Sequence, residues 1–390
     1  MSEMIYHYKS EATIKFGGHS INSVPDLESG VKIENMEADS AFVGLLPKGC
    51  EFCRRGSKMV LLVTGRCSTG CYYCPLSREK KGRGVMYANE LRVEREEQLL
   101  EEAELMDAEG TGITGGDPVQ DLERTLKAIR MLKGRFGDRH HIHLYTSTID
   151  REAFMRLEEA GLDEIRVHPP LDLWEGMGST CLEDVVAETG MEIGLEVPCI
   201  PGEELRLRSL VRWADDVGMK FVNLNELEFS ETNSAALLAR GFEVKDDVSS
   251  AVLGSERMAL DILGMELRIS RHYCSSSFKD GVQLRRRITR RAENVALDLD
   301  IITDDGTLVK GMLETDDPAS VMALLEERFD VPPDLMRHDT EKRRVEVASW
   351  VLEDIAALLP QPAYEVEEYP TADRLEVERT PLNPAAFRRR

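Results

Sequence analysis

Residues 65–75 read Gly65-Arg66-Cys67-Ser68-Thr69-Gly70-Cys71-Tyr72-Tyr73-Cys74-Pro75, and they directly follow an apolar run at 59–64 that predicts a buried strand. Three thiolates on one loop can bind three irons of a 4Fe–4S cluster and leave the fourth iron open. The alternative is zinc, which would need a fourth thiolate or imidazole to close a tetrahedron, and this loop supplies none. The spacing therefore predicts an iron–sulfur cluster on Cys67, Cys71 and Cys74.

Strand and helix patterns alternate along the chain on both sides of this loop. Strands are predicted at 59–64, 112–114, 141–146, 164–168, 191–197 and 221–225, with helices near 94–109, 122–133, 151–160, 182–188 and 203–217. Six strands that alternate with helices imply parallel βαβ units in an α/β fold. The chemistry of such folds lies at the C-terminal ends of the strands.

A loop with these three cysteines after the first strand of an α/β barrel resembles that of the radical S-adenosylmethionine (SAM) superfamily, over about residues 58–230. The resemblance implies a partial (β/α)6 barrel in which the open iron binds the amino and carboxylate groups of SAM. It also implies that reduction cleaves SAM to methionine and a 5′-deoxyadenosyl radical, which abstracts hydrogen from a substrate. Tyr73 is then expected against the adenine, and ferredoxin or flavodoxin is expected as the electron donor.

A second motif, Thr114-Gly115-Gly116-Asp117-Pro118, follows the second predicted strand, where the family has Gly-Gly-Glu. Gly115 and Gly116 would let the backbone approach the SAM ammonium group closely. The Asp117 carboxylate would complement its charge, although Asp in place of Glu departs from the family pattern.

Polar residues also end three of the later strands. Ser147, His168 and Asn225 are candidates for contact with SAM or substrate. His168 precedes a proline, which holds its backbone extended. The alternative for each is a satisfied polar group at the rim of the barrel.

A second set of cysteines begins with Cys50 and Cys53, a C-x2-C knuckle ahead of the loop. Such a knuckle is half of many zinc or iron–sulfur sites. Cys274 and His272 are candidate completing ligands, because they lie where the chain leaves the predicted barrel. A structural metal such as zinc, an auxiliary redox cluster and unligated thiols remain as alternatives.

Three parts are expected in this chain of 390 residues: an N-terminal segment at 1–57, a barrel at 58–232 and a C-terminal α+β domain at 233–390. The last part should contain helices near 246–263, 319–329 and 345–359 and a linker at 271–280. Two hairpins are also expected there, one at 295–313 around Asp304-Asp305-Gly306 and one at 364–379.

The amino-acid composition restricts the classes of molecule that the protein is expected to bind. Acidic residues outnumber basic ones by 72 to 49, for a net charge of −23, which argues against non-specific nucleic-acid binding. A salt-adapted proteome would produce the same acidity. The basic cluster Arg285-Arg286-Arg287 with Arg290-Arg291 is either a solvated helix face or an anion-binding patch. No stretch approaches the ~18 apolar residues of a membrane helix, and residues 1–7 lack a secretory pattern. We therefore expect a soluble, cytoplasmic protein.

Over its whole length the chain resembles an archaeal group of radical SAM proteins distantly similar to pyruvate formate-lyase activating enzyme. The motifs are Pro47-Lys48-Gly49-Cys50, the stretch at 279–285 and Tyr369-Pro370-Thr371. This resemblance implies a cobalamin-dependent C-methyltransferase that modifies a glutamine of methyl-coenzyme M reductase, a protein of methanogenesis. Methylcobalamin would be the methyl donor, bound between the barrel and the C-terminal domain without a histidine axial ligand, because the usual cobalamin-binding loop is absent from the sequence.

Three other functions remain open. An enzyme that installs a glycyl radical on a partner would need no cobalamin and a shorter chain than this one. A tRNA-modifying enzyme would use the arginine cluster at 285–291. A non-enzymatic module with a structural cluster would leave the Gly-Gly-Asp motif without a use.

Overall fold

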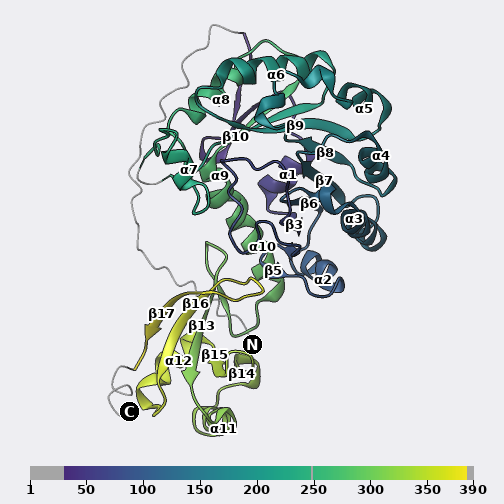
Figure 1. Ribbon diagram of the computed structural model, residues 1–390. Coiled ribbons are helices and arrows are strands. Elements are labelled where there is room, and N and C mark those ends of the chain that lie inside the picture. Colours follow the sequence, from purple (N-terminus) through teal and green to yellow (C-terminus); the bar gives the residue numbers. More distant parts are fainter. Residues whose placement is uncertain (1–29, 247–248, 384–390) are drawn as a thin grey trace.

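The computed structural model describes residues 30–246 and 249–383, which form two units joined through α10 (Arg285–Val295) (Figure 1). Among the described residues, an 11-stranded sheet with its helices makes up the larger unit, and a 6-stranded sheet makes up the smaller one. Residues 1–29 of the predicted N-terminal segment and 384–390 of the predicted C-terminal domain lie outside the described residues. Within the described ranges, every helix is too short or too polar to cross a membrane.

Parallel strands form the centre of the larger sheet, in the order β11-β10-β9-β8-β7-β6-β3. Their bounds are β3 (Lys58–Thr64), β6 (Gly110–Gly115), β7 (His141–Thr146), β8 (Glu164–Val167), β9 (Glu192–Cys199), β10 (Phe221–Glu226) and β11 (Ser270–Cys274). Short antiparallel strands continue both edges: β2 (Ala41–Val43) and β1 (Glu34–Asn35) beside β11, and β4 (Tyr87–Ala88) and β5 (Leu91–Arg92) beside β3. The sheet is therefore an open, partial α/β barrel, as the sequence predicted.

The strand β11 corrects two of the predictions. Residues 271–280 were expected to be a linker, but Ser270–Cys274 pairs in parallel with β10 and adds a strand to the predicted six. The sheet therefore continues well beyond residue 232, the predicted end of the barrel. Extended pairing on both sides, with β10 and with β2, explains why this segment is a strand.

Most helices of the larger unit cover the outside of the sheet (Figure 1). They are α2 (Glu97–Leu105), α3 (Leu122–Phe136), α4 (Arg151–Glu159), α5 (Leu182–Glu188), α6 (Glu204–Asp216), α7 (Ser234–Leu238) and α8 (Ser255–Leu263). The short α9 (Ser276–Phe278) differs, because its Phe278 lines a cavity on the inner side together with Cys53. The helix predicted at 246–263 forms only from Ser255, after Gly254 with φ of 90°. In contrast, α1 (Lys48–Arg55) lies against the inner side, where Gly49 is so close to His143 and Arg166 that a Cβ atom would clash with both.

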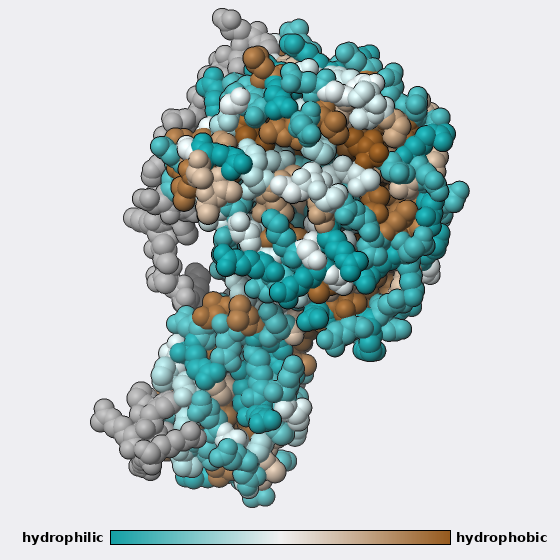
Figure 2. Space-filling model, in the orientation of Figure 1, coloured by the Kyte–Doolittle hydropathy of each residue, from teal (hydrophilic) through white to brown (hydrophobic). Residues whose placement is uncertain are grey.

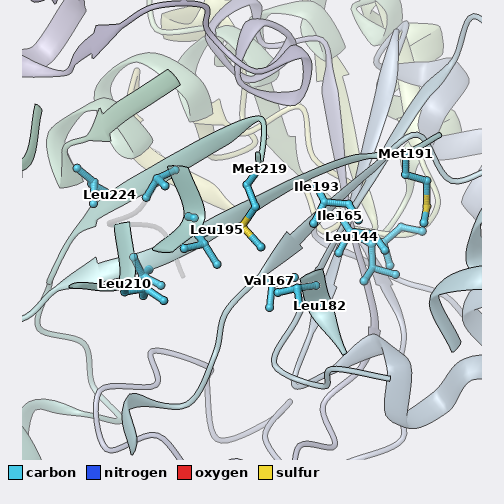
Figure 3. Packing of buried hydrophobic residues seen from close by; sticks show 14 of the residues in the cluster. Leu144, Ile165, Val167, Leu182, Met191, Ile193, Leu195, Leu210, Met219 and Leu224 are labelled. Carbon is cyan, nitrogen blue, oxygen red and sulfur yellow. The ribbon is translucent and has the colours of Figure 1, made fainter. Parts of the chain in front are cut away.

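The two sides of the parallel strands differ in chemistry, because successive side chains point to opposite faces. Apolar side chains face the helices: Figure 3 shows Ile165, Val167 and Leu195 of the strands near Leu182 of α5 and Leu210 of α6, all in one buried cluster. The alternate positions face the interior and are polar: His143, Tyr145, Glu164, Arg166, Glu196, Asn223, Asn225 and His272. A polar interior in a buried sheet provides groups for binding rather than for packing.

The smaller unit is an antiparallel sheet with two helices on it. Its strands are β12 (Ile301–Ile302), β13 (Leu308–Glu314), β14 (Met336–Asp339), β15 (Arg344–Val347), β16 (Ala363–Glu368) and β17 (Glu376–Pro381), and its helices are α11 (Pro318–Phe329) and α12 (Ser349–Ile355). Both predicted hairpins are present, as β12–β13 and β16–β17. Two predicted boundaries were wrong. The first hairpin was expected from residue 295, but α10 extends to Val295 and the first strand of the hairpin begins only at Ile301. The helix expected from residue 345 begins only at Ser349, because 344–347 form a strand that pairs with β13.

The arginine cluster lies on α10, and four of its five arginines pair with carboxylates of the larger unit. Arg287 contacts Glu90 at 2.6 Å, and Arg291 contacts Glu102 at 2.9 Å. The remaining pairs are Arg286–Glu37, Arg290–Asp107 and the longer Arg285–Asp305. The cluster is thus not a free anion-binding patch: Arg287 and Arg291 are buried in ion pairs, whereas Arg285 and Arg286 stay partly exposed. Figure 2 shows hydrophilic residues over most of one face of both units, with smaller hydrophobic patches between them.

Candidate active site

A cavity of about 520 Å³ lies at the C-terminal ends of the parallel strands. Cys67, Cys71 and Cys74 line it, because the loop after β3 folds over these strand ends. The opposite wall comes from the ends of the other strands: Gly116, Ser147, His168, Glu196 and Asn225. The volume is within the range of roughly 300–1,000 Å³ that is typical of small-molecule sites.

The three loop thiols fit a 4Fe–4S cluster better than a single metal ion. Cys67 is exposed, and Cys71 and Cys74 are partly buried. In the described part of the chain, no three His, Cys, Asp or Glu side chains are grouped to hold one metal ion. A cluster does not need such a group, because each thiolate binds a different iron. The nearby imidazole of His168 is engaged through both ring nitrogens and does not complete a zinc site.

The two glycines of the second motif allow the turn after β6 to pack on the start of the cysteine loop. A Cβ atom on Gly115 would clash with the Thr64 carbonyl, and one on Gly116 would clash with the Arg66 carbonyl. Gly115 also has φ of 156°, at the edge of the region that favours glycine. The Gly116 and Asp117 amides donate to Thr64 and Arg66 oxygens, both at 2.7 Å. Gly116 lines the cavity, whereas Gly115 lies behind it.

Asp117 does not face the cavity, although the sequence suggested a contact with SAM. Its side chain is fully buried and accepts hydrogen bonds from the Thr146, Ser147 and Thr148 hydroxyls at 2.6–2.8 Å. The Val119 and Thr148 amides also donate to it. The Asp117 carboxylate thus accepts its hydrogen bonds from groups of the protein itself. Asp117 therefore positions the cavity wall from behind.

Ser147, Tyr73 and His168 connect the cysteine loop to the strand ends. The Ser147 hydroxyl lies 2.6 Å from the hydroxyl of Thr69, which belongs to the loop. His168 Nδ1 lies 2.9 Å from the Glu196 carbonyl and its Nε2 lies 3.1 Å from the Tyr73 hydroxyl. Burial lowers the pKa of His168, which favours a neutral ring that donates from Nδ1 and accepts from Tyr73. All three residues line the cavity.

Glu196 is the polar centre of the barrel interior. Arg166 and Asn223 donate to its Oε2 at 2.9 and 2.8 Å, and Asn225 donates to its Oε1 at 2.9 Å. Burial alone would raise its pKa, but Arg166 and the two asparagine donors lower it, so the carboxylate stays charged. Asn225, a predicted site residue, thus reaches the cavity together with Glu196.

The second set of cysteines surrounds an inner cavity of about 180 Å³. Cys50 and Cys53 reach it from α1, and His272 and Cys274 reach it from β11. The two cavities share Tyr145, Glu196, Asn225 and Lys279 in their linings, so they meet inside the barrel. The structure therefore brings these predicted ligands together and places them next to the first site.

Sequence reasoning did not single out Glu196, Lys58 or Lys279 as site residues. A signal was present, because residues 193–199 carry one charged residue, Glu196, in an otherwise apolar stretch. Lys58 begins β3, lines the inner cavity and is buried. Lys279 pairs with Glu228 at 3.0 Å, and both line the outer cavity.

Comparisons with known proteins agree with this geometry. Residues 61–171 match the model of the radical SAM superfamily, and 306–382 match a domain of unknown function, DUF8061. A relative from Methanocaldococcus jannaschii is 39% identical over 366 residues, which cover 88% of this chain and 96% of the relative. It carries the name "Putative glycyl-radical enzyme activating enzyme".

Solved structures are more distant. SuiB of Streptococcus suis, bound to S-adenosylmethionine, has 13% identity and a TM-score of 0.36 over 56% of this chain and 50% of that chain. TsrM of Kitasatospora setae, a radical S-adenosylmethionine methyltransferase with cobalamin and a [4Fe–4S] cluster bound, has 16% identity and a TM-score of 0.36 over 63% and 53%. This chain thus spans about half the length of those two proteins. On the archaeal relative and the match over 61–171, the chain belongs to the radical SAM superfamily.

Proposed function

We propose that this radical SAM enzyme is an activating enzyme, which removes a hydrogen atom from a glycine of a protein partner. The observation that carries the proposal is the outer cavity, a single space of about 520 Å³ with three thiols on one wall and strand-end polar groups on the other. A cavity of this size suits one SAM molecule together with the reacting part of one substrate. The name of the archaeal relative supports the same class.

In this proposal Cys67, Cys71 and Cys74 hold a 4Fe–4S cluster, and SAM lies against Gly116, with the wall residues Tyr73, Ser147, His168 and Asn225 around it. When bound and reduced, the cluster supplies the electron that splits SAM into methionine and a 5′-deoxyadenosyl group able to take a hydrogen atom from carbon. That electron would come from ferredoxin or flavodoxin.

The protein's own residues position these groups. The Gly116 turn, tied to Thr64 and Arg66, fixes the strand end under the cysteine loop. The Glu196 carboxylate reaches the cavity and is held in place by Arg166 and Asn225. A fixed charge of this kind would orient the cationic end of SAM without reorganisation.

Cobalamin-dependent methylation of a glutamine in methyl-coenzyme M reductase is the second candidate. The smaller unit favours it, because hydrogen abstraction alone does not call for a second domain. However, among the described residues the smaller unit contributes no side chain to the outer cavity, so cobalamin bound there would have to share the space with SAM. Chain length does not separate the candidates, since the relative named as an activating enzyme matches over 366 residues.

Products distinguish the two candidates. Reduced, anaerobically reconstituted protein would be given SAM, hydroxocobalamin and a glutamine-containing peptide of methyl-coenzyme M reductase. The activating enzyme should form 5′-deoxyadenosine without S-adenosylhomocysteine, and the peptide should keep its mass. Formation of methylcobalamin with an equal amount of S-adenosylhomocysteine, or a methyl gain on the peptide, would overturn the proposal in favour of the methyltransferase.

A further inference from the structure

The inner cavity is a second site that the proposed reaction does not use. It is lined by Cys50, Cys53, Cys274 and His272, which are residues of two elements far apart in the sequence. We propose that these four side chains hold a second iron–sulfur cluster, enclosed by the barrel beneath the SAM cavity.

The local structure brings all four side chains to the lining of one cavity. Cys50 and Cys53 are three residues apart on α1, so they lie on the same face of that helix. His272 and Cys274 are two residues apart on β11, so both face the same side of the sheet. Because α1 packs against the inner side of the strands, these two faces meet across the cavity.

The space between them suits a cluster rather than one ion. A zinc ion draws four ligands into a tight tetrahedron with metal–ligand distances of about 2.0–2.3 Å. The cavity that they line together with other residues has a volume of about 180 Å³, and among the described residues no three potential ligands are grouped to hold one ion. A cluster fills such a space, because each protein ligand binds a different iron.

Unused polar groups around the cavity point to an anionic occupant. The Lys58 side chain is buried, yet within the described ranges no acceptor or carboxylate pairs with its ammonium group. Arg166 is also buried; it pairs with Glu164 and Glu196, but its Nη2 atom has no hydrogen-bond partner among the described residues. A buried ammonium group such as that of Lys58 is costly without a partner. A cluster bound by thiolates would supply the missing negative charge.

The atoms next to the ligands are arranged as metal sites require. Arg166 and Asn223 each place an N–H donor 3.4 Å from Cys50 Sγ, and such donors would stabilise a thiolate bound to iron. His272 Nε2 is buried and has no partner within the described ranges, so it is available as a ligand. Its other nitrogen, Nδ1, lies 3.3 Å from Asn223 Oδ1, the second contact that metal-binding histidines make.

The decisive test removes the first cluster and leaves the second. A Cys67→Ala/Cys71→Ala/Cys74→Ala variant changes only the loop at the strand ends, away from the inner cavity. After anaerobic reconstitution with iron and sulfide, it should retain about four irons and four sulfides per chain, half of the wild-type content. Loss of all bound iron, or one zinc per chain in its place, would overturn the proposal.

The reverse variant completes the test. Cys50→Ala/Cys53→Ala protein should bind about half of the wild-type iron, on the loop thiols alone. Cys181→Ala, a partly buried thiol that lines neither cavity, is the matched control and should keep the full iron content. Full iron content in the Cys50→Ala/Cys53→Ala variant would also overturn the proposal. Neither measurement depends on SAM cleavage, so the result is separate from that for the proposed function.

Discussion

The Ser147 hydroxyl donates to Asp117 Oδ2 at 2.8 Å, which joins the end of β7 to the turn after β6 behind the cofactor cavity. Asp117, which was expected to contact SAM, therefore holds in place a residue that lines the cavity, Ser147. A buried carboxylate with several donors holds its neighbours in one geometry, because leaving any donor without a partner is costly.

Asp117→Asn should destabilise the barrel. The amide presents N–H groups to hydroxyls that now donate to a carboxylate, and each hydrogen bond to a charged group contributes about 1.5–3 kcal/mol. We expect the free energy of unfolding to fall by roughly 2–4 kcal/mol, measured by urea unfolding at neutral pH. Asp172→Asn, at an exposed position, should change it by less than about 0.5 kcal/mol. Equal effects of the two substitutions would show that Asp117 does not hold the wall.

Gly116→Ala should displace the cysteine loop. The added Cβ atom would collide with the Arg66 carbonyl, one residue before the first loop cysteine. Iron content should fall to about half, the share held by the inner cavity, and 5′-deoxyadenosine formation should fall at least tenfold, while the circular dichroism spectrum stays that of the wild type. The control is Gly134→Ala on α3, where a Cβ atom meets nothing within 4 Å. Wild-type iron loading in Gly116→Ala protein would contradict this account.

The strands and the cysteine loop were predictable because their signals are local. Apolar runs gave the strands from 58 to 226 to within a few residues, and β7 was predicted without error. In contrast, β11 was missed because Arg271-His272-Tyr273-Cys274 is polar at the positions that face the barrel interior, which resembles a loop. Its strand identity comes from pairing with β10 and β2, which are distant in the sequence.

The sequence indicated which residues gather at the site but not how each side chain is oriented there. The triplet of cysteines, Ser147, His168 and Asn225 all line one cavity, as their positions at strand ends suggested. The orientation of Asp117 was not predictable, since it depends on hydroxyls of 146–148 that approach from another strand. The ion pairs of the arginine cluster at 285–291 were not predictable for the same reason, because the carboxylate partners of Arg287 and Arg291 lie almost two hundred residues away in the sequence.

Acid should destabilise the smaller unit. Burial alone raises the pKa of Asp339, but the Lys342 amide and the Arg374 guanidinium lower it to about 2. The unfolded pKa is about 3.9, so this group stabilises the folded unit above about pH 4, and the contribution is lost as the pH falls toward 2.

The fluorescence of Trp350 on α12 reports on this unit in a Trp174→Phe/Trp213→Phe background. The urea concentration at the midpoint of unfolding should decrease as the pH is lowered from 4 to 2. Asp339→Asn should flatten that dependence, while Asp334→Asn, at an exposed position, should leave it unchanged. An unaltered acid profile in Asp339→Asn protein would assign the effect to other groups.

Lys58→Met should shift the midpoint potential of the second cluster to more negative values. The ammonium group lines the inner cavity without a partner among the described residues, and a nearby positive charge favours the reduced, more negative cluster. Redox titration followed by electron paramagnetic resonance, in the variant without the loop cysteines, measures this potential. Lys127→Met, an exposed lysine of α3, should leave it unchanged. A potential insensitive to Lys58 would place the cluster elsewhere.

The most direct test of the central claim is the formation of 5′-deoxyadenosine and methionine by the reduced, reconstituted protein given SAM. We expect the two products in a ratio of about one to one, because a single bond of SAM is split by a single electron at the cluster. Cys71→Ala should reduce both to background, and Cys181→Ala should match the wild type. Undiminished product formation by Cys71→Ala protein would contradict the assignment of the cluster to the loop after β3.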